Sequence, residues 1–385
     1  MFSSIIRIKG VIYMYLIKNV SVYSPQYLGK KDVLISNKIE MIEDDIDCDL
    51  FEIIDGTNKK LVPGFIDQHV HITGGGGEGS FHTKAPEINL STLTSSGITT
   101  VLGLLGTDGI SRDVENLLSK AKALKEEGLS VYIVSGSYQY PSITITGDIK
   151  KDIMFIDEVI GCKLAQSDHR SSYITTQDLI TLASDIRVSS LLSGKAGVFI
   201  LHMGDDMLAL NQVFEVLEKT SLPITLFRPT HVTRTSHLLE DAYRFLEMGG
   251  YIDMTAGDQY SATKAILEAK KRGLPLHKIT ISSDGQGSWS KYDQNGHLIE
   301  IGISSVKCLY KEFLNLLKNG LSMEEALSFF TYNVACGLSL NKGEIRVGKD
   351  ADLLLLDDDN HICDVIALGK RHVIEGIQVI KGTYE

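Results

Sequence analysis

Two histidines separated by one residue, His69 and His71, are the strongest candidates for chemistry in this sequence. They end an apolar segment, residues 61–71, that has the character of a β-strand, and alternation along a strand points both imidazoles to the same side. Two imidazoles placed in this way can share a metal ion such as Zn²⁺. Two half-buried histidines without a metal would have the same spacing, so the pair alone leaves both interpretations open.

Eight apolar, β-rich segments recur along the chain and alternate with helical patterns. The segments are residues 64–70, 99–105, 131–135, 159–164, 198–201, 224–227, 251–255 and 279–282. Helical patterns include residues 114–127, 176–192 and 207–220, and two later helices are expected at residues 303–318 and 322–336. Regular alternation of buried strands with helices is typical of parallel α/β folds. The sequence therefore predicts an α/β protein with a closed (β/α)8 TIM-like barrel.

The two ends of the chain have a different texture, with short strand patterns and no convincing helix. Such patterns occur at residues 15–22, 32–35, 39–42 and 51–55, and again from residue 343 to about residue 381. We expect both ends to meet in one small β-sandwich domain. The expected division is residues 1–60 for its N-terminal part, residues 61–342 for the barrel and residues 343–385 for its C-terminal part.

Composition excludes several classes of partner. A formal net charge of −11 argues against a nucleic-acid surface or an anionic membrane surface, both of which require clustered positive charge. No apolar run approaches the roughly 20 residues that span a bilayer. Residues 1–18 have no signal-peptide pattern, and residues 1–13 are open to interpretation as an extension before Met14. The five cysteines are scattered without CxxC spacing, which indicates reduced thiols in a cytoplasmic protein.

Metal-ligating residue types recur at the C-terminal ends of the expected strands, where barrel enzymes carry their active sites. They are His69 and His71 at the first strand, Lys163 at the fourth, His202 after the fifth, His231 after the sixth and Asp284 after the eighth. A lysine in its ammonium form cannot coordinate a cation, so Lys163 would need another state. The neighbouring Cys162 is expected to point away from the barrel interior and to be a buried structural thiol.

This arrangement resembles the amidohydrolase superfamily and, within it, the isoaspartyl (β-aspartyl) dipeptidases. The resemblance runs from about residue 15 to the C-terminus, and its most specific segments are residues 63–80, 135–138, 161–170, 228–234 and 282–288. It implies two Zn²⁺ ions per chain and a Lys163 that CO₂ has converted to a carbamate. In that scheme His69, His71 and Asp284 hold one ion, His202 and His231 hold the other, and the Lys163 carbamate bridges them.

The same resemblance implies a set of substrate residues. A β-aspartyl dipeptide carries one ammonium and two carboxylates. Glu78 is assigned to the ammonium and Arg170 and Arg234 to the carboxylates. Further polar contacts are assigned to Gly76, Thr107 and Ser288, and Tyr138 is expected to donate a hydrogen bond to the developing oxyanion.

The implied reaction is attack of a metal-bridging hydroxide on the amide carbonyl, with Asp284 as general base and then general acid. A cyclic-amide hydrolase of the dihydroorotase or hydantoinase kind would share the metal ligands but would have no ammonium for Glu78 to bind. A non-catalytic scaffold with the same fold is a third interpretation. The expected partners are a small dipeptide substrate and further copies of the chain. The metal in the cell, the oligomeric state and the preferred residue after aspartate stay open.

Overall fold

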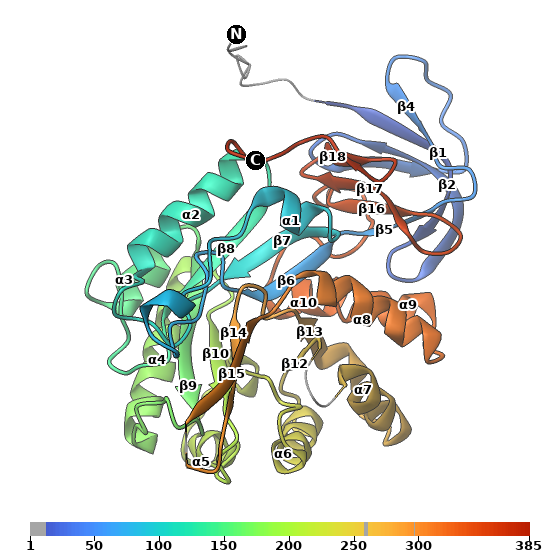
Figure 1. Cartoon of the computed structure of the whole chain (residues 1–385). Coiled ribbons are helices and arrows are strands. Elements are labelled where there is room, and N and C mark those ends of the chain that lie inside the picture. The colour runs from blue at the N-terminus through green and yellow to red at the C-terminus, as the bar shows by residue number, and fades with distance from the viewer. Residues whose placement is uncertain (1–12, 258–260, 296) are drawn as a thin grey trace.

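The architecture is that of a computed structural model, which describes residues 13–257, 261–295 and 297–385 (Figure 1). The expectation of an N-terminal extension concerns residues 1–13, and all of these except Tyr13 lie outside the described residues. The described chain forms a barrel of parallel strands surrounded by helices, with a second sheet beside it. In Figure 1 the blue strands from the beginning of the chain lie together with the red strands from its end.

Within the described residues, eight parallel strands form the barrel. They are β6 (Phe65–Val70), β7 (Ile98–Gly103), β8 (Ser130–Gly136), β9 (Val159–Gln166), β10 (Val198–Met203), β11 (Phe227–Thr230), β12 (Ile252–Thr255) and β13 (Ile279–Ser282). Strands β6 to β11 pair in chain order, β12 pairs with β13, β11 lies beside β12, and β13 lies beside β6. A parallel bridge between Val70 and Gly285 links the two ends of the ring. The predicted fold class is confirmed.

Helices cover the outside of the barrel because each presents an apolar side to the strands. They are α1 (Leu90–Thr94), α2 (Val114–Glu126), α3 (Ile149–Phe155), α4 (Thr176–Ser193), α5 (Asn211–Lys219), α6 (Ser236–Glu247), α7 (Ala262–Lys271), α8 (Lys307–Lys318), α9 (Met323–Ser328) and α10 (Tyr332–Gly337). Local signals fix the ends of α4: Thr175 and Asp178 form a capping box, and Gly194 ends the helix in a left-handed conformation. In the part of the chain that the structure describes, no helix has the length and apolar character to cross a membrane.

Several boundaries differ from the sequence prediction, and the helix expected at residues 322–336 is divided into α9 and α10. The segment expected as the sixth strand at residues 224–227 is mostly a 3-10 turn, η2 (Ile224–Leu226), and the strand is β11. Periodicity missed β11 because Arg228 interrupts its apolar pattern, yet this arginine is fully buried and donates to Gln68 Oε1 at 2.8 Å. The helix expected from residue 303 begins at Lys307, and the one expected from residue 207 begins at Asn211.

A hairpin between barrel strand β13 and helix α8 was not predicted. Strand β14 (Ser288–Tyr292) pairs antiparallel with β15 (Leu298–Ile303). Residues 298–303 lie shortly before α8, and their apolar side chains continue its pattern in the sequence. The sequence prediction therefore began the helix at residue 303, which is the last residue of β15. The described chain also contains two other 3-10 turns, η1 (Phe81–Thr83) and η3 (Leu276–Lys278).

Strands from both chain ends form one sheet, which is nine-stranded within the described residues. They are β1 (Tyr15–Tyr23), β2 (Tyr27–Ile35), β3 (Ile39–Glu43), β4 (Glu52–Asp55), β5 (Lys60–Pro63), β16 (Leu353–Leu356), β17 (Ile362–Ala367), β18 (Lys370–Ile374) and β19 (Ile377–Gln378). Strand β5 joins the two halves because it pairs with β1 on one side and β16 on the other. These strands share a hydrophobic core separate from that of the barrel. The domain boundaries at residues 60 and 343 stay a prediction.

A buried lysine connects the barrel with the terminal sheet. The Lys342 side chain is 1% exposed, and its ammonium donates to Ser130 Oγ at 2.6 Å and to Thr100 Oγ1 at 3.1 Å. It also forms an ion pair with Asp352, which is itself buried. Thr100 lies on barrel strand β7, whereas Asp352 directly precedes β16 of the terminal sheet. The ammonium therefore holds the two parts together through charge-assisted hydrogen bonds.

Replacing Lys342 by Met is expected to lower the free energy of unfolding by about 3–5 kcal/mol, because Asp352 would stay buried without its cation. Urea unfolding followed by circular dichroism measures this change. Lys270→Met is the matched control, since Lys270 forms an ion pair with Glu325 at the surface and its loss should cost at most about 1 kcal/mol. Equal losses in the two variants would contradict the proposed role of the buried pair.

Candidate active site

The residues predicted to bind metal come together at one mouth of the barrel. His69 lies in β6, Lys163 in β9 and His202 in β10, whereas His71, His231 and Asp284 lie just beyond the ends of β6, β11 and β13. Lys163 Nζ is 3.2 Å from His69 Nε2. Asp284 Oδ1 is 3.1 Å from His71 Nε2 and 3.4 Å from His69 Nε2. Parallel strands gather these side chains because their carboxyl ends all face the same side of the barrel.

The two remaining histidines complete the cluster. The His231 ring lies 4.9 Å from the ring of His69 and 4.6 Å from the ring of His202, measured between ring centroids. His69, His231 and Asp284 each offer a ligand atom, and these atoms lie within 4.8 Å of one another. Such a set of imidazoles and a carboxylate is the donor chemistry of a zinc-type site.

Two of the cluster residues have an unusual backbone. His231 has a φ of 61° and Asp284 a φ of 52°, which place both in the left-handed region that non-glycine residues rarely adopt. Strained conformations of this kind concentrate at functional sites, where the surrounding structure imposes them. Here each occurs immediately after a barrel strand, where the chain turns sharply and the side chain stays at the mouth.

Burial keeps the candidate ligands in the uncharged forms that can bind a metal. It lowers the pKa of His69, His202 and His231 well below the usual histidine value. Burial also lowers the pKa of the Lys163 amine to about 7, so much of it is neutral near physiological pH. Among the described residues, His69 Nδ1, His71 Nδ1 and His231 Nε2 are buried without a hydrogen-bond partner. His231 Nδ1 is hydrogen-bonded to Thr255 Oγ1 at 2.6 Å, so its unpartnered Nε2 is the nitrogen that fits a bound metal.

The predicted substrate residues form a second group beside the metal-ligand cluster. The Glu78 carboxylate is 6% exposed and accepts hydrogen bonds from Thr107 Oγ1 at 3.0 Å and from Ser288 Oγ at 2.8 Å. Arg170 Nη1 is 3.4 Å from the same carboxylate. Gly76 has a φ of +83°, and a Cβ there would lie 2.5 Å from the Thr83 carbonyl oxygen. Only glycine fits that position, so it allows the loop that carries Glu78 to fold tightly.

Asp168, which the sequence analysis did not single out, lies at the centre of the arginine pair. Arg170 Nε donates to Asp168 Oδ1 at 2.9 Å, and Arg170 Nη2 donates to Oδ2 at 2.8 Å. Arg234 Nη1 is 3.7 Å from Asp168 Oδ2. Burial alone would raise the pKa of Asp168, but hydrogen bonds from Arg170 and His202 hold it far below its usual value. The sequence could have indicated Asp168 as a site residue, because it lies two positions before Arg170 in the loop after β9.

Tyr138 directs its hydroxyl into the cluster. The hydroxyl oxygen is 2.8 Å from His202 Nδ1, and the ring lies 5.2 Å from Arg170 Cζ and 5.3 Å from Lys163 Nζ. Burial raises the pKa of this phenol, which therefore stays protonated and can donate a hydrogen bond. Cys162 is also buried, and burial raises its pKa to about 12. It packs with the apolar residues between the barrel and its helices, as the sequence predicted.

A cavity of about 520 Å³ opens over this site. Its lining includes Arg170, Arg234, Asp284 and Ser288, together with Trp289 of the hairpin that was not predicted from sequence. The volume falls within the range of small-molecule pockets. The hairpin therefore contributes a wall of the site, and Ser288 is its one residue that the sequence analysis assigned to substrate.

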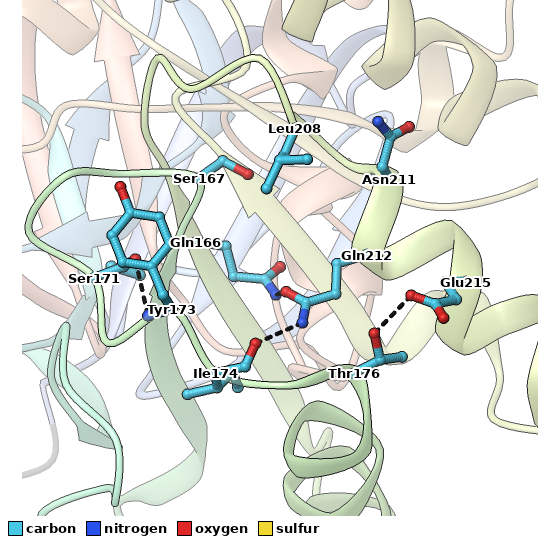
Figure 2. Close-up of a pocket in the computed structure, with 11 residues that line it drawn as sticks. Gln166, Ser167, Ser171, Tyr173, Ile174, Thr176, Leu208, Asn211, Gln212 and Glu215 are labelled. Atoms are coloured by element: carbon cyan, nitrogen blue, oxygen red, sulfur yellow. Dashed lines mark hydrogen bonds between the residues drawn. The ribbon is translucent and has the colours of Figure 1, made fainter.

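A second cavity, of about 330 Å³, is enclosed by the end of β9, the loop that follows it and the beginnings of α4 and α5 (Figure 2). Amide and hydroxyl side chains line it, and Gln166 Nε2 donates to Gln212 Oε1 at 2.9 Å. Ser167 and Tyr173 of its lining belong to the same loop as Arg170. None of the residues predicted to bind metal or substrate lines this cavity, so it is separate from the candidate active site.

Comparisons with known proteins identify the family. The sequence model of the Amidohydrolase family matches residues 212–382. The structure is similar to that of a β-aspartyl dipeptidase from Fervidobacterium islandicum AW-1 in complex with β-Asp-Leu. The TM-score is 0.92 and the identity 43%, over 95% of this chain and 98% of that one. This chain belongs to the amidohydrolase superfamily and is a hydrolase. The resemblance to β-aspartyl dipeptidases that was identified from sequence is confirmed.

Curated relatives carry a different name. A dihydroorotase from Elusimicrobium minutum is 43% identical over 390 residues, which cover 89% of this chain and 88% of that protein. A dihydroorotase from Listeria monocytogenes is 37% identical over 118 residues. That match spans only 27% of the length of the Listeria protein. The two kinds of relative are named for different substrates. One name refers to β-aspartyl dipeptides and the other to the cyclic amide dihydroorotate.

Replacing His231 by Ala is expected to lower the divalent metal content of the purified protein, because a central donor of the cluster is lost. Plasma mass spectrometry after dialysis against metal-free buffer measures this content. The matched control is His237→Ala, since His237 is exposed on α6 and contacts the Met207 carbonyl oxygen. A His231→Ala protein with as much metal as the control would show that this cluster does not hold the metal.

Proposed function

We propose that the protein is a metal-dependent hydrolase of β-aspartyl dipeptides. The observation that carries the proposal is the buried Glu78 carboxylate, held by Thr107 and Ser288 at the edge of the metal-ligand cluster. A buried carboxylate at the edge of this cluster is suited to bind a cationic group, and the Arg170 guanidinium already lies 3.4 Å from it. Arg170 and Arg234 line the same cavity and offer positive charge. Glu78 and the two arginines match the one ammonium and two carboxylates of such a dipeptide, and Asp168 pairs with both arginines in the absence of substrate.

Two Zn²⁺ ions are the proposed cofactors. His69, His71 and Asp284 would hold one ion, His202 and His231 the other, and a carbamate on Lys163 would bridge them. When bound, such ions polarise an amide carbonyl and acidify a water molecule into a nucleophile. The lowered pKa of Lys163, caused by its burial, supports the carbamate because only the neutral amine can react with CO₂.

The protein's own residues then have defined tasks. Asp284 is the proposed proton carrier: it accepts the proton of the attacking water and delivers it to the leaving amine. Its Oδ1 lies at the cluster, 3.1 Å from His71 Nε2. The protonated Tyr138 hydroxyl, which also faces the cluster, donates a hydrogen bond to the carbonyl oxygen as negative charge develops there. Glu78 and the arginines orient the substrate, and Gly76 lets the loop backbone come close.

The comparison with the Fervidobacterium enzyme supports this choice, because that protein is described in complex with β-Asp-Leu and matches over nearly its whole length. The second candidate is a cyclic-amide hydrolase, which the Elusimicrobium dihydroorotase favours. Glu78 separates the two candidates, since a cyclic amide has no ammonium and the carboxylate of dihydroorotate would be repelled by the Glu78 carboxylate. A non-catalytic scaffold would not require six metal-ligating groups in one cavity.

The proposed setting is the cytoplasm, and the proposed assembly is a homo-oligomer. The cysteines support a reducing compartment, since no disulfide joins any of them in the described chain. Exposed apolar side chains support self-association. Phe155 at the end of α3 and Leu191 and Leu192 near the end of α4 are each more than half exposed, and the two helices pack side by side.

Purified enzyme should hydrolyse β-Asp-Leu and show little turnover of α-Asp-Leu or dihydroorotate. In the α-peptide the ammonium lies one bond nearer the scissile carbonyl, so it cannot meet Glu78 while the amide is at the metals. Glu78→Gln should abolish most of the activity on β-Asp-Leu, because a hydrogen-bonding site that loses its partner discriminates strongly. Release of leucine measures turnover.

Glu87→Gln is the matched control for this prediction, since Glu87 is exposed and pairs with Lys120 at the surface. It should keep the parental rate. Equal turnover of both aspartyl linkages would remove the proposed selectivity. Faster turnover of dihydroorotate than of either dipeptide would favour the second candidate function.

Asp284→Asn is expected to lower kcat on β-Asp-Leu by about 10²–10⁴-fold, the usual loss when a general acid/base is removed. The substitution keeps the size of the side chain and one oxygen that can face the cluster. Steady-state kinetics at equal metal content measures the effect, so that a loss of metal is not mistaken for a loss of proton transfer. A normal kcat in the metal-loaded variant would transfer the proton-carrying role to another group.

A further inference from the structure

The two ring nitrogens of His202 have very different surroundings. Nδ1 is 2.8 Å from the Tyr138 hydroxyl at the cluster. Nε2 is enclosed by three groups, with Asp168 Oδ2 at 3.2 Å, Arg234 Nη1 at 3.0 Å and Arg170 Nη2 at 3.5 Å. Nδ1 is therefore the nitrogen that remains for a metal, since both guanidinium groups crowd Nε2.

A metal bound to Nδ1 would fix which nitrogen must carry the proton. A neutral imidazole has one N–H, and a nitrogen that binds a metal must offer its lone pair instead. If Nδ1 is the ligand atom, the proton is on Nε2 and needs an acceptor. Guanidinium groups only donate, so Asp168 is the acceptor among the three groups around Nε2.

We propose that Asp168 is a positioning residue that holds His202 in the Nε2–H tautomer and, with the same carboxylate, fixes Arg170 and Arg234. This inference rests on the proposed metal site. Second-sphere carboxylates commonly orient metal-binding histidines in this way. Here one buried anion would link the metal site to both arginines proposed to bind the substrate carboxylates.

The opposite tautomer shows why the carboxylate matters. Arg234 Nη1, 3.0 Å from Nε2, can only donate and so favours an unprotonated Nε2, whereas Asp168 Oδ2 at 3.2 Å favours a protonated one. Without Asp168, nothing would oppose Arg234, and the proton would move to Nδ1. His202 would then present an N–H to the metal site. The two guanidinium groups would also lose their shared buried anion and would repel each other.

The backbone brings Asp168 to this place through a close approach of two loops. Gly204 follows β10, and a Cβ at this position would lie 2.4 Å from Asp168 Cα and 2.2 Å from the Ser167 carbonyl oxygen. Gly204 N also donates to the Gln166 carbonyl oxygen at 3.0 Å. Glycine at position 204 therefore leaves the room that the Asp168 backbone needs, and the carboxylate can reach His202.

The test begins with the parent protein in its metal-free form, labelled with ¹⁵N-histidine. Nitrogen chemical shifts distinguish the two tautomers, and the His202 signal is identified by its loss in His202→Asn. The expected result is the Nε2–H tautomer. A parent His202 that carries its proton on Nδ1 would overturn the proposal, and this measurement does not depend on any Asp168 variant being folded.

The second arm compares Asp168→Ala, Asp168→Asn and Asp206→Ala. Asp206 is the matched control because it lies in a neighbouring loop and its carboxylate accepts a hydrogen bond from the Tyr173 hydroxyl at 2.8 Å. Asp168→Ala should bind Zn²⁺ about 10–100-fold more weakly in chelator competition and should shift His202 to the Nδ1–H tautomer. Asp168→Asn, which retains one acceptor oxygen, should fall between Asp168→Ala and the parent. Both variants should raise KM for β-Asp-Leu through the released Arg170.

Parental Zn²⁺ affinity and an unchanged His202 tautomer in a folded Asp168→Ala protein would overturn the proposal. This result can be distinguished from a failure of the proposed function by the properties of the parent protein. A parent protein that binds no Zn²⁺ and does not cleave β-Asp-Leu would refute that function, whereas a parent with both properties and an insensitive Asp168→Ala variant would refute only the role of Asp168.

Discussion

The closure of eight parallel strands is the constraint on which the rest of the molecule depends. Each strand runs from the floor of the barrel to the same mouth, so residues that are distant in sequence end their strands as neighbours in space. His69 and Asp284 are more than two hundred residues apart in the chain, yet their polar atoms lie 3.4 Å from each other. The terminal sheet and the buried Lys342 stabilise this closure from outside, away from the mouth.

Burial of many basic groups in one place creates the second constraint. Imidazoles, the Lys163 amine and two guanidinium groups share the mouth, and few anions are there to balance them. Asp284 faces the histidines, Glu78 accepts hydrogen bonds from Thr107, Ser288 and Arg170, and Asp168 lies between the arginines and His202. Each carboxylate thus has a separate environment, which is the condition for separate roles in binding, positioning and proton transfer.

Most of the site was accessible from sequence because its signals are local. The alternation of a strand places His69 and His71 on one side, and the repeated strand and helix pattern places Lys163, His202 and Asp284 at the ends of the fourth, fifth and eighth strands. The contacts of Glu78 were not accessible in that way. They join four loops, and only the folded chain shows that Thr107, Ser288 and Arg170 converge on one carboxylate.

What the sequence by itself determined is the set of elements and the residue types at their ends, because periodicity and turn residues are properties of neighbouring positions. Tertiary structure decided the rest. It buried Arg228 inside the barrel and so made a strand of residues 227–230, and it formed the hairpin that brings Trp289 to the cavity. It also placed Asp168 against Nε2 of His202. Hydrogen-bond partners and burial are set through space by packing, and no local pattern in the chain encodes them.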